Sequence, residues 1–399
     1  MKQSFPKGIV LVTIILMDLL SGMEFDIFVP SFPELQNQFS LSPFQVESLL
    51  SLNFIGFCLS LFFVGALSDR YGRKPIILIG LIIFIIGSIF CLWTLSYESL
   101  LFGRFLQGIG IAAPSILCFL IIADSYPIEK QQSLMALLNG LMNLAVGGAP
   151  VAGSYITMYF HWQGNFATLL ALGIVVLILT IFFIPKAAVP EHKEPVSLKG
   201  YIPIFQSKTL MILIINFIFI FVPYWIFVGM SPLLYMQDLG VSLAHFGYYQ
   251  GAICAVYGIG SILYGLIIHK IDQRKFLYYA CLIWFISLIL ILYVAVGDIR
   301  DPLLITLIII LFCIGQISTT SLFPLCLNYM PHMKAKVSAL IQGGRLIVSA
   351  LSLGLAGHFY QGNFQNIGII IAAFIFLATI FLLFVLSNRE LVKAIKLTP

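Results

Sequence analysis

Three carboxylate side chains lie in one apolar stretch near the N-terminus, residues 8–29, which holds no other charged residue: Asp18, Glu24 and Asp26. At about 1.5 Å per residue of helix, Asp18 lies about 15 Å into the stretch and Asp26 about 27 Å. Asp18 and Asp26 are about 80° apart around such a helix and share a broad face, whereas Glu24, about 240° from Asp18, points elsewhere. Burial disfavours the charged form of a carboxylate, which can then hold a proton at neutral pH and release it when water enters. The pattern predicts proton-binding groups, with Asp18 as the main titrating residue and Asp26 as the second.

Arg104 and Arg345 are the two basic residues inside other apolar stretches. A charge within a bilayer is costly and by default indicates a functional role. Arg345 follows Gln342 by three residues on the same side of a helix, and it is suited to bind an anionic group or to balance the carboxylates. The alternative for each arginine is a long side chain that reaches the polar interface. For Glu24 and Asp26 the alternative is a place among the outer lipid headgroups.

Uncharged polar residues are scattered through the remaining apolar stretches. We expect a substrate cavity to be lined by Arg345 together with Asn53, Gln107, Asn143, Tyr224, Gln316 and Gln342. The alternative is that these residues hydrogen-bond between helices. Aromatic residues make up 14% of the chain, and an aromatic cavity suits a lipophilic, cationic compound. Pro223, next to Tyr224, predicts a break in its helix.

The composition excludes most soluble classes. Of the 399 residues, 60% are hydrophobic and 9% are charged, with a mean hydropathy of +1.05, whereas soluble domains carry about 25% charged residues. So few charges cannot cover the surface of a soluble enzyme, a nucleic-acid binder or a secreted disulfide scaffold. The seven cysteines lie in apolar stretches without a C-x-x-C pair, which indicates buried thiols rather than a metal site.

Apolar stretches of membrane-spanning length recur along the whole chain. We predict an all-α membrane protein with 12 transmembrane helices, at 8–29, 46–67, 75–96, 99–122, 131–158, 166–184, 209–235, 245–268, 276–297, 303–329, 336–358 and 366–387. With a cytoplasmic N-terminus, 18 of the 21 Lys and Arg residues fall on the inside. This asymmetry predicts that both termini are cytoplasmic and that the net charge of +5 reflects topology.

The two halves of the chain resemble each other. Gly65-x-x-x-Asp69-Arg70 after the second predicted helix corresponds to Gly265-x-x-x-His269-Lys270 after the eighth. Such parallel repeats predict two six-helix bundles around a central substrate site. We expect an N-terminal bundle over 1–184, a cytoplasmic linker over 185–208, a C-terminal bundle over 209–387 and a cytoplasmic tail over 388–399.

A ten-residue motif follows the second predicted helix and consists of Gly65, Asp69, Arg70, Gly72, Arg73 and Lys74 with four intervening residues. It resembles the signature G-x-L-x-D-R-x-G-R-K of the major facilitator superfamily. The resemblance implies that superfamily's fold of two six-helix bundles. It also implies that Asp69 governs alternating access and does not contact substrate.

Further motifs resemble those of proton-coupled members of this superfamily. Arg104-x-x-Gln107-Gly108-x-Gly110 is similar to R-x-x-Q-G-x-G, which implies a role of Arg104 in proton coupling. The stretch containing Gly148, Pro150 and Gly153 resembles the antiporter motif G-P-x-x-G-G, with Ala149 and Ser154 as departures. Asp26-x-x-x-Pro30-x-x-Pro33 resembles the start of the Bcr/CflA-like branch of the DHA1 drug:H+ antiporters.

These resemblances imply a proton-coupled exporter of amphipathic drugs or small molecules in the bacterial inner membrane. An alternative is a transporter, importing or exporting, of a specific metabolite or a siderophore-like anion whose carboxylate Arg345 binds. An enzyme is not expected, because the sequence has no H-E-x-x-H or G-x-S-x-G motif. We expect no cofactor other than the proton gradient. The expected partners are a small-molecule substrate, protons and membrane lipid, without nucleic acid, and the expected state is a monomer.

Overall fold

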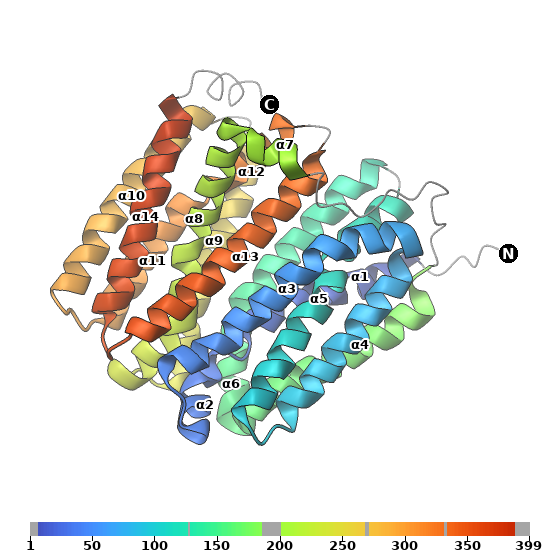
Figure 1. Ribbon diagram of the computed structural model, residues 1–399, viewed down its shortest axis with the longest axis horizontal. Helices are drawn as coiled ribbons and strands as arrows, with labels where there is room; N and C mark the ends of the chain where they lie inside the picture. Colours follow the sequence, from blue (N-terminus) through green and yellow to red (C-terminus); the bar gives the residue numbers. More distant parts are fainter. Residues whose placement is uncertain (1–6, 127, 186–200, 268–270, 331–332, 388–399) are drawn as a thin grey trace. The chain divides into compact units, whose positions relative to one another are not determined.

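The computed structural model describes residues 7–126, 128–185, 201–267, 271–330 and 333–387, which form helices joined by short turns and no strand. The chain divides into two compact units, Met1–Val196 and Ser197–Pro399. Figure 1 shows the helices of both units. The boundary between them falls inside the stretch 185–208 that the sequence analysis interprets as a linker, of which 186–200 lies outside the described residues.

The first unit is built from six α-helices and one short 3-10 turn within its described residues. They are α1 (Lys7–Asp26), η1 (Val29–Ser31), α2 (Phe32–Phe39), α3 (Pro43–Tyr71), α4 (Arg73–Leu92), α5 (Tyr97–Ser125) and α6 (Ile128–Phe183). Helix α5 packs against α3 and α4, and α1 packs against α6 and α5. The carboxylates of α1 therefore lie next to α5, which carries Arg104.

Helix α6 covers two predicted spans, 131–158 and 166–184, because it consists of two helices that meet at His161. His161 has a φ of 59°, a left-handed conformation that a residue with a side chain rarely adopts. Directly after this break, the backbone N–H of Trp162 donates to Glu34 Oε2 at 3.0 Å. A carboxylate on the first N–H groups of a helix is the usual way to satisfy a helix start.

The second unit has the same helical character within its described residues. It contains α7 (Ile202–Gln206), α8 (Lys208–Pro232), the π-helical turn η3 (Leu233–Asp238), α9 (Leu243–Ile267), α10 (Gln273–Val296), α11 (Pro302–Gln316), α12 (Thr319–Tyr329), α13 (Lys334–Phe359) and α14 (Phe364–Ser387). Helix α14 packs against α8 and α10, α13 packs against α8, and α11 packs against α9 and α10.

Nine helical stretches of the described residues are long and apolar enough to cross a membrane. One of them, Gly140–Phe183, contains the break at His161. The predicted spans at 245–268 and 303–329 are also helical, as α9 and as α11 followed by α12. These helices are consistent with the predicted count of twelve, and the prediction of an all-α, multi-pass membrane protein is confirmed.

The predicted break at Pro223 is wrong. Helix α8 passes through Pro223 without interruption and runs from Lys208 to Pro232. A proline removes one backbone donor, and a neighbouring helix can satisfy the acceptor groups around it. Gln316 Nε2 donates to the carbonyl oxygen of Ile220 at 2.6 Å, within one turn of Pro223. The irregularity comes later, where α8 continues into the π-helical turn η3.

Candidate functional site

A fully buried ion pair joins α1 to α5. Arg104 Nη1 lies 2.6 Å from Glu24 Oε1, and neither side chain is exposed. The same nitrogen of Arg104 donates to Gln107 Oε1 at 2.7 Å, and Asn53 Nδ2 of α3 donates to Glu24 Oε1 at 2.8 Å. The alternative interpretations, a snorkelling arginine and a glutamate among headgroups, do not agree with this burial. Glu24 and Arg104 pair with each other inside the first unit.

The pair belongs to a larger hydrogen-bonded group, which we call the Glu24 network: Glu24, Asn53, Ser88, Arg104 and Gln107. Ser88 of α4 accepts a hydrogen bond from Gln107 Nε2 at 2.9 Å, so the network joins α1, α3, α4 and α5. The guanidinium carbon of Arg104 also lies 4.0 Å from the centroid of the Phe28 ring. The predicted motif residues Arg104 and Gln107 thus lie in one network with Glu24 of α1.

The Glu24 network leaves some of its hydrogen-bonding groups unused. Among the described residues, Glu24 Oε2, Asn53 Oδ1 and Arg104 Nη2 are buried without a hydrogen-bond partner. A buried polar group without a partner costs about 1–3 kcal/mol, more if it is charged. A proton, a ligand or a new side-chain partner that bonded these unpaired atoms would therefore lower the free energy of the site.

Asp26 is buried near the network but has no partner. Its side chain is 1% exposed, and neither carboxylate oxygen has a hydrogen bond within the part of the chain that the structure describes. Asp26 and Glu24 are two residues apart on α1. The only cation that pairs with either in the described residues is Arg104, and it pairs with Glu24.

Asp18 lies eight residues before Asp26 on α1, slightly more than two turns, and is also 1% exposed. Its Oδ1 lies 3.9 Å from Cys118 Sγ of α5, a weak contact, and its Oδ2 has no partner among the described residues. All three carboxylates predicted from the sequence are thus buried within the first unit. Glu24, which was expected to point away from Asp18, is the one that pairs with the arginine.

Glu47 of α3 is a buried carboxylate that was not among the predicted site residues. It is fully buried, and both of its oxygens lack a hydrogen-bond partner in the described ranges. Glu47 lies at the edge of the predicted span 46–67, a position typical of a residue at the membrane interface, so its burial was not expected. Helical spacing was the available signal, because Glu47, Leu50, Phe54 and Phe57 recur at intervals of three and four and are all buried.

The last two basic residues of the motif, Arg73 and Lys74, begin α4 and contact α5 and the end of α6. Arg73 Nε lies 3.2 Å from Asp124 Oδ2 of α5, and Arg73 Nη1 donates to Ser68 Oγ at 2.6 Å. Lys74 Nζ donates to the carbonyl oxygens of Ile181 and Ile184 at 2.7 and 2.8 Å. A cation is favourable there because the last carbonyls of a helix have no partner within it.

The glycines of this motif differ in what they provide. Gly72 has a φ of 91° and makes the tight turn from α3 to α4, which a residue with a side chain would adopt only under strain. Gly65 has no atom within 4 Å of the position of a Cβ. Arg70 is exposed and stacks on Tyr71. The side chain of Asp69 lies outside what the structure describes, so its role stays a prediction. Asp124, the partner of Arg73, was not among the predicted site residues.

The antiporter-like motif has one glycine at a close contact. A Cβ at Gly153 would overlap the backbone carbonyl of Ile27, just past the end of α1. A Cβ at Gly148 would meet nothing within 4 Å. Pro150 is buried inside α6. The side chain of Asn143, predicted to line the cavity, lies outside the described part of the chain.

In the second unit, two of the predicted cavity residues have partners within that unit. Gln316 is buried and donates to the Ile220 carbonyl, and the Tyr224 hydroxyl contacts Cys254 Sγ at 3.0 Å. These contacts agree with the alternative in which polar residues join helices. Their contact with a substrate stays a prediction.

Arg345 of α13 retains unused donor capacity. Its guanidinium carbon lies 4.7 Å from the centroid of the Phe221 ring of α8. Its Nε is buried and, among the described residues, has no hydrogen-bond partner, and the same holds for Gln342 Oε1 one turn earlier. Arg345 and Gln342 are therefore the predicted cavity residues of this unit with buried polar atoms left unpaired.

The helical architecture, with an ion pair buried in the first unit and an arginine inside the second, defines a polytopic membrane protein. The sequence profile of the Major Facilitator Superfamily matches residues 14–353. The chain belongs to this superfamily, and the prediction from its motifs is confirmed.

Relatives with curated names are similar to parts of the chain or to most of it. The multidrug resistance protein MdtL of Klebsiella pneumoniae is 29% identical over 230 residues, 56% of this chain and 57% of MdtL. The chain thus matches little more than half the length of that relative. The bicyclomycin resistance protein homolog of Haemophilus influenzae is 25% identical over 358 residues, 88% of this chain and 89% of the relative.

Solved structures show the same fold at low sequence identity. A D-xylose–proton symporter superposes with a TM-score of 0.71 at 15% identity, over 94% of this chain and 97% of the symporter. A bacterial homolog of the human lysosomal transporter Spinster superposes with a TM-score of 0.74 at 16% identity, over 95% and 96%. These likenesses establish the fold and nothing about the substrate.

Proposed function

We propose that this protein is a secondary transporter that works by alternating access and exchanges protons for amphipathic small molecules, exporting them across the bacterial inner membrane. Membership of the major facilitator superfamily and relatives named for multidrug and bicyclomycin resistance support this. The same proposal includes cytoplasmic termini, the proton gradient as the only energy source, no cofactor, no enzymatic activity and a monomeric state. It also places the protein in the DHA1 antiporter group.

The observation that carries the proposal is the buried pair of Glu24 and Arg104 with the unpaired Asp26 beside it on α1. A carboxylate buried without a partner is favoured in its neutral, protonated form. In our proposal Asp26 and Asp18 hold exchangeable protons, and Arg104 neutralises Glu24. When water or a cationic substrate reaches the carboxylates, a proton is released and the incoming positive charge takes its place.

Arg104 couples these events because one guanidinium nitrogen bonds Glu24 and Gln107 at the same time. Its Nη2 is buried and unpartnered in the described structure. A second acceptor, such as a deprotonated carboxylate, can therefore be bound without losing the first. We propose that Asp69, with the Arg73–Asp124 and Lys74 contacts, controls the change of access on the cytoplasmic side.

Proton flux in proteoliposomes tests the proposal. Wild-type protein and the variants Asp26→Asn and Asp18→Asn are compared with a panel of cationic, neutral and anionic amphipathic compounds. Glu98→Gln, an exposed carboxylate in the first turn of α5, is the control. We expect cations to trigger proton movement in wild type and Glu98→Gln and the movement to be lost in Asp26→Asn. Unchanged coupling in both aspartate variants would contradict the proposal.

A second candidate is transport of a siderophore-like or other anionic metabolite. The observation in its favour is Arg345, whose buried Nε has no partner among the described residues and which could receive a carboxylate in bidentate geometry. In the same panel, this candidate predicts that an anionic compound alone triggers flux. It also predicts that Arg345→Lys loses this response, because an ammonium lacks the planar fork.

A further inference from the structure

Glu47 of α3 is a buried carboxylate to which the proposed mechanism assigns no role. Its side chain is fully buried, and neither of its oxygens has a hydrogen-bond partner in the described part of the chain. Asp26 is in the same condition, whereas Glu24 and Asp18 each have one oxygen in contact with a neighbouring side chain. Within the described residues, Glu47 and Asp26 are therefore the two carboxylates that are buried with both oxygens unpaired.

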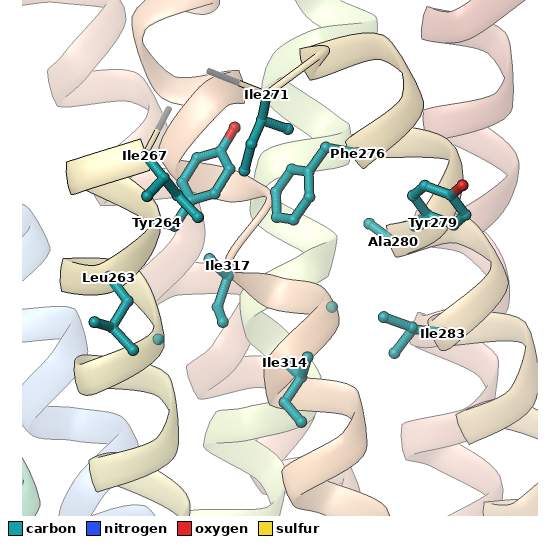
Figure 2. Close-up of a pocket in the computed structure, with 12 residues that line it drawn as sticks. Leu263, Tyr264, Ile267, Ile271, Phe276, Tyr279, Ala280, Ile283, Ile314 and Ile317 are labelled. Carbon is teal, nitrogen blue, oxygen red and sulfur yellow. The ribbon is translucent and has the colours of Figure 1, made fainter. Parts of the chain in front are cut away.

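The second unit offers no comparable group within its described residues, because none of its carboxylate oxygens is buried without a partner. An open groove on the surface of α11, between α9 and α10, has apolar walls that include Leu263, Phe276 and Ile314 (Figure 2). No carboxylate is among the described residues that line it. As far as the described ranges extend, the unpaired buried carboxylates thus belong to the first unit.

Glu47 lies near the exposed start of α3. The helix begins at Pro43, and Phe44, three residues before Glu47, is 46% exposed. The hydroxyl of Tyr97, the first residue of α5, donates to the carbonyl oxygen of Gln45 at 3.0 Å. Helices α3 and α5 therefore begin at the same end of the unit. In the proposed topology, with cytoplasmic termini, this is the outer end.

Glu47 lies between this end and the Glu24 network. Asn53, the member of the network on α3, is six residues further along the helix, which corresponds to about 9 Å. Leu49, two residues after Glu47, accepts a hydrogen bond at its carbonyl oxygen from Arg104 Nε at 3.4 Å. Glu47 is thus less than one turn from an exposed residue and nearly two turns from the network.

The side chain of Glu47 lies on the face of α3 turned away from α5. A Cβ at Gly56 would overlap the carbonyl oxygen of Phe105 in α5, and Gly56 is nine residues from Glu47, about 180° around the helix. Phe54 is seven residues from Glu47, about 20° away, and its ring packs on Phe25 of α1 with centroids 5.3 Å apart. Glu47 therefore shares the face of α3 that contacts α1.

No cation compensates a charge on Glu47 within the described residues. Helices α1, α2, α4 and α5 contact α3, and the titratable groups on their parts nearest the outer end are Glu24, Asp26, Glu34, Cys91, Tyr97, Glu98 and Arg104. Arg104 is the one cation in this set, and it pairs with Glu24. A carboxylate buried under these conditions is favoured in its neutral, protonated form.

We propose that Glu47 is an outer proton-binding site that links the pH of the outer solution to the access cycle. One carboxylate oxygen of Glu47 takes a proton from the outer solution before the start of α3 is buried, and the proton returns to that solution when this end opens and water solvates the carboxylate. A proton that binds one arrangement better than another shifts the equilibrium towards it. Acid outside therefore favours the arrangement in which Glu47 is buried. The place of Glu47 in the access cycle rests on the proposed function, whereas its proton does not.

Infrared spectroscopy of the full chain in lipid membranes tests the proton on Glu47, because a protonated carboxyl group and a carboxylate absorb at different frequencies. Wild type is compared at neutral pH with Glu47→Gln, which is of similar volume, and with Glu98→Gln, which removes an exposed carboxylate. We expect Glu47→Gln to lose part of the protonated-carboxyl band and Glu98→Gln to keep all of it. An unchanged band in Glu47→Gln would overturn the proposal. Thermal unfolding establishes that each variant is folded.

Labelling with a membrane-impermeant thiol reagent in right-side-out vesicles tests the link to outer pH. Leu50→Cys places a thiol at a fully buried position one turn from Glu47, and Phe44→Cys, at an exposed position, reports the effect of pH on the thiol itself. The chain without an introduced cysteine gives the background of the seven native cysteines, which are buried.

Relative to Phe44→Cys, we expect labelling of Leu50→Cys to fall as the outer solution is acidified. Glu47→Gln should remove this dependence, because an amide cannot titrate, and Glu47→Asp should retain it. The same pH dependence with and without Glu47→Gln would overturn the proposal.

Substrate-driven proton flux separates this proposal from the proposed function. Loss of flux in Asp26→Asn together with an unchanged pH dependence of labelling in Glu47→Gln would leave the proposed antiport intact and overturn the role of Glu47. If wild type shows no substrate-driven flux, the proposed antiport fails. The infrared band and the labelling of Leu50→Cys then still decide whether Glu47 binds a proton and responds to outer pH.

Discussion

The backbone N–H of Trp162 donates to the carboxylate of Glu34, so α2 supplies the capping group for the second half of α6. The other oxygen of Glu34 lies 2.9 Å from His161 Nδ1, on the residue whose φ of 59° separates the two halves of α6. The carboxylate of Glu34 thus joins α2 to the break in α6 and satisfies the start of the second half of α6. The contact belongs to the fold and not to the Glu24 network.

Glu34→Ala should lower the free energy of unfolding by about 1 kcal/mol, the usual cost of losing a helix cap. Asn37→Ala, at an exposed position on the same helix α2, is the control and should change stability little. Thermal unfolding in detergent measures both. Equal unfolding temperatures for wild type and Glu34→Ala would mean that the cap contributes nothing to stability.

The buried pair of Glu24 and Arg104 should behave as a unit in a double-mutant cycle. Removing one partner of a buried ion pair leaves an uncompensated charge and costs about 3–5 kcal/mol. We therefore expect Glu24→Gln and Arg104→Gln each to lower the unfolding temperature strongly. The double variant should recover much of the loss, because its two neutral amides leave no buried charge. Additive effects in the double variant would show that the two residues do not interact.

Helical periodicity predicted much of this site from the sequence. Asp18, Glu24 and Asp26 were placed in one membrane helix, and the arginine of α5 was identified by its cost inside a bilayer. Their pairing could not be predicted, because Glu24 and Arg104 are 80 residues apart and a spacing within one helix does not reveal which neighbour packs against it. Angular position alone suggested that Glu24 points away from the other carboxylates, and it gave no information on the partner that lies there.

The fold shows the same division between local and non-local information. The apolar stretches predicted where helices lie, but the sequence predicted a break at Pro223 and none of the irregularity at η3. Proline affects its own helix, whereas the donor from Gln316 that satisfies the Ile220 carbonyl comes from a different helix. At His161 the helices are more continuous than the sequence predicted. A connection of several residues was expected between 158 and 166, but only His161 departs from helical conformation.

Gly153→Ala and Gly148→Ala are a matched pair within the antiporter-like motif. A Cβ at Gly153 would overlap the Ile27 carbonyl, whereas one at Gly148 has open space. Backbone atoms cannot move aside as a flexible side chain can, so α6 must shift away from the end of α1 in Gly153→Ala. We expect Gly153→Ala to lower both the unfolding temperature and transport, and Gly148→Ala to resemble wild type. Similar behaviour of the two variants would mean that close packing at Gly153 is not required.

The Arg73–Asp124 contact should affect transport more than stability. The two side chains are 18% and 43% exposed, and ion pairs in water contribute about 0–1 kcal/mol. Arg73→Gln and Asp124→Asn should therefore leave the unfolding temperature nearly unchanged.

If the contact holds the motif against α5 in one state of the access cycle, both variants should slow substrate-driven proton flux by a similar factor, and the double variant should slow it no further. Arg300→Gln, which removes another surface pair, with Asp298 in the second unit, should leave the flux unchanged. Multiplicative losses in the double variant would show that Arg73 and Asp124 act separately, and an equal loss in Arg300→Gln would show that the flux responds to surface charge in general.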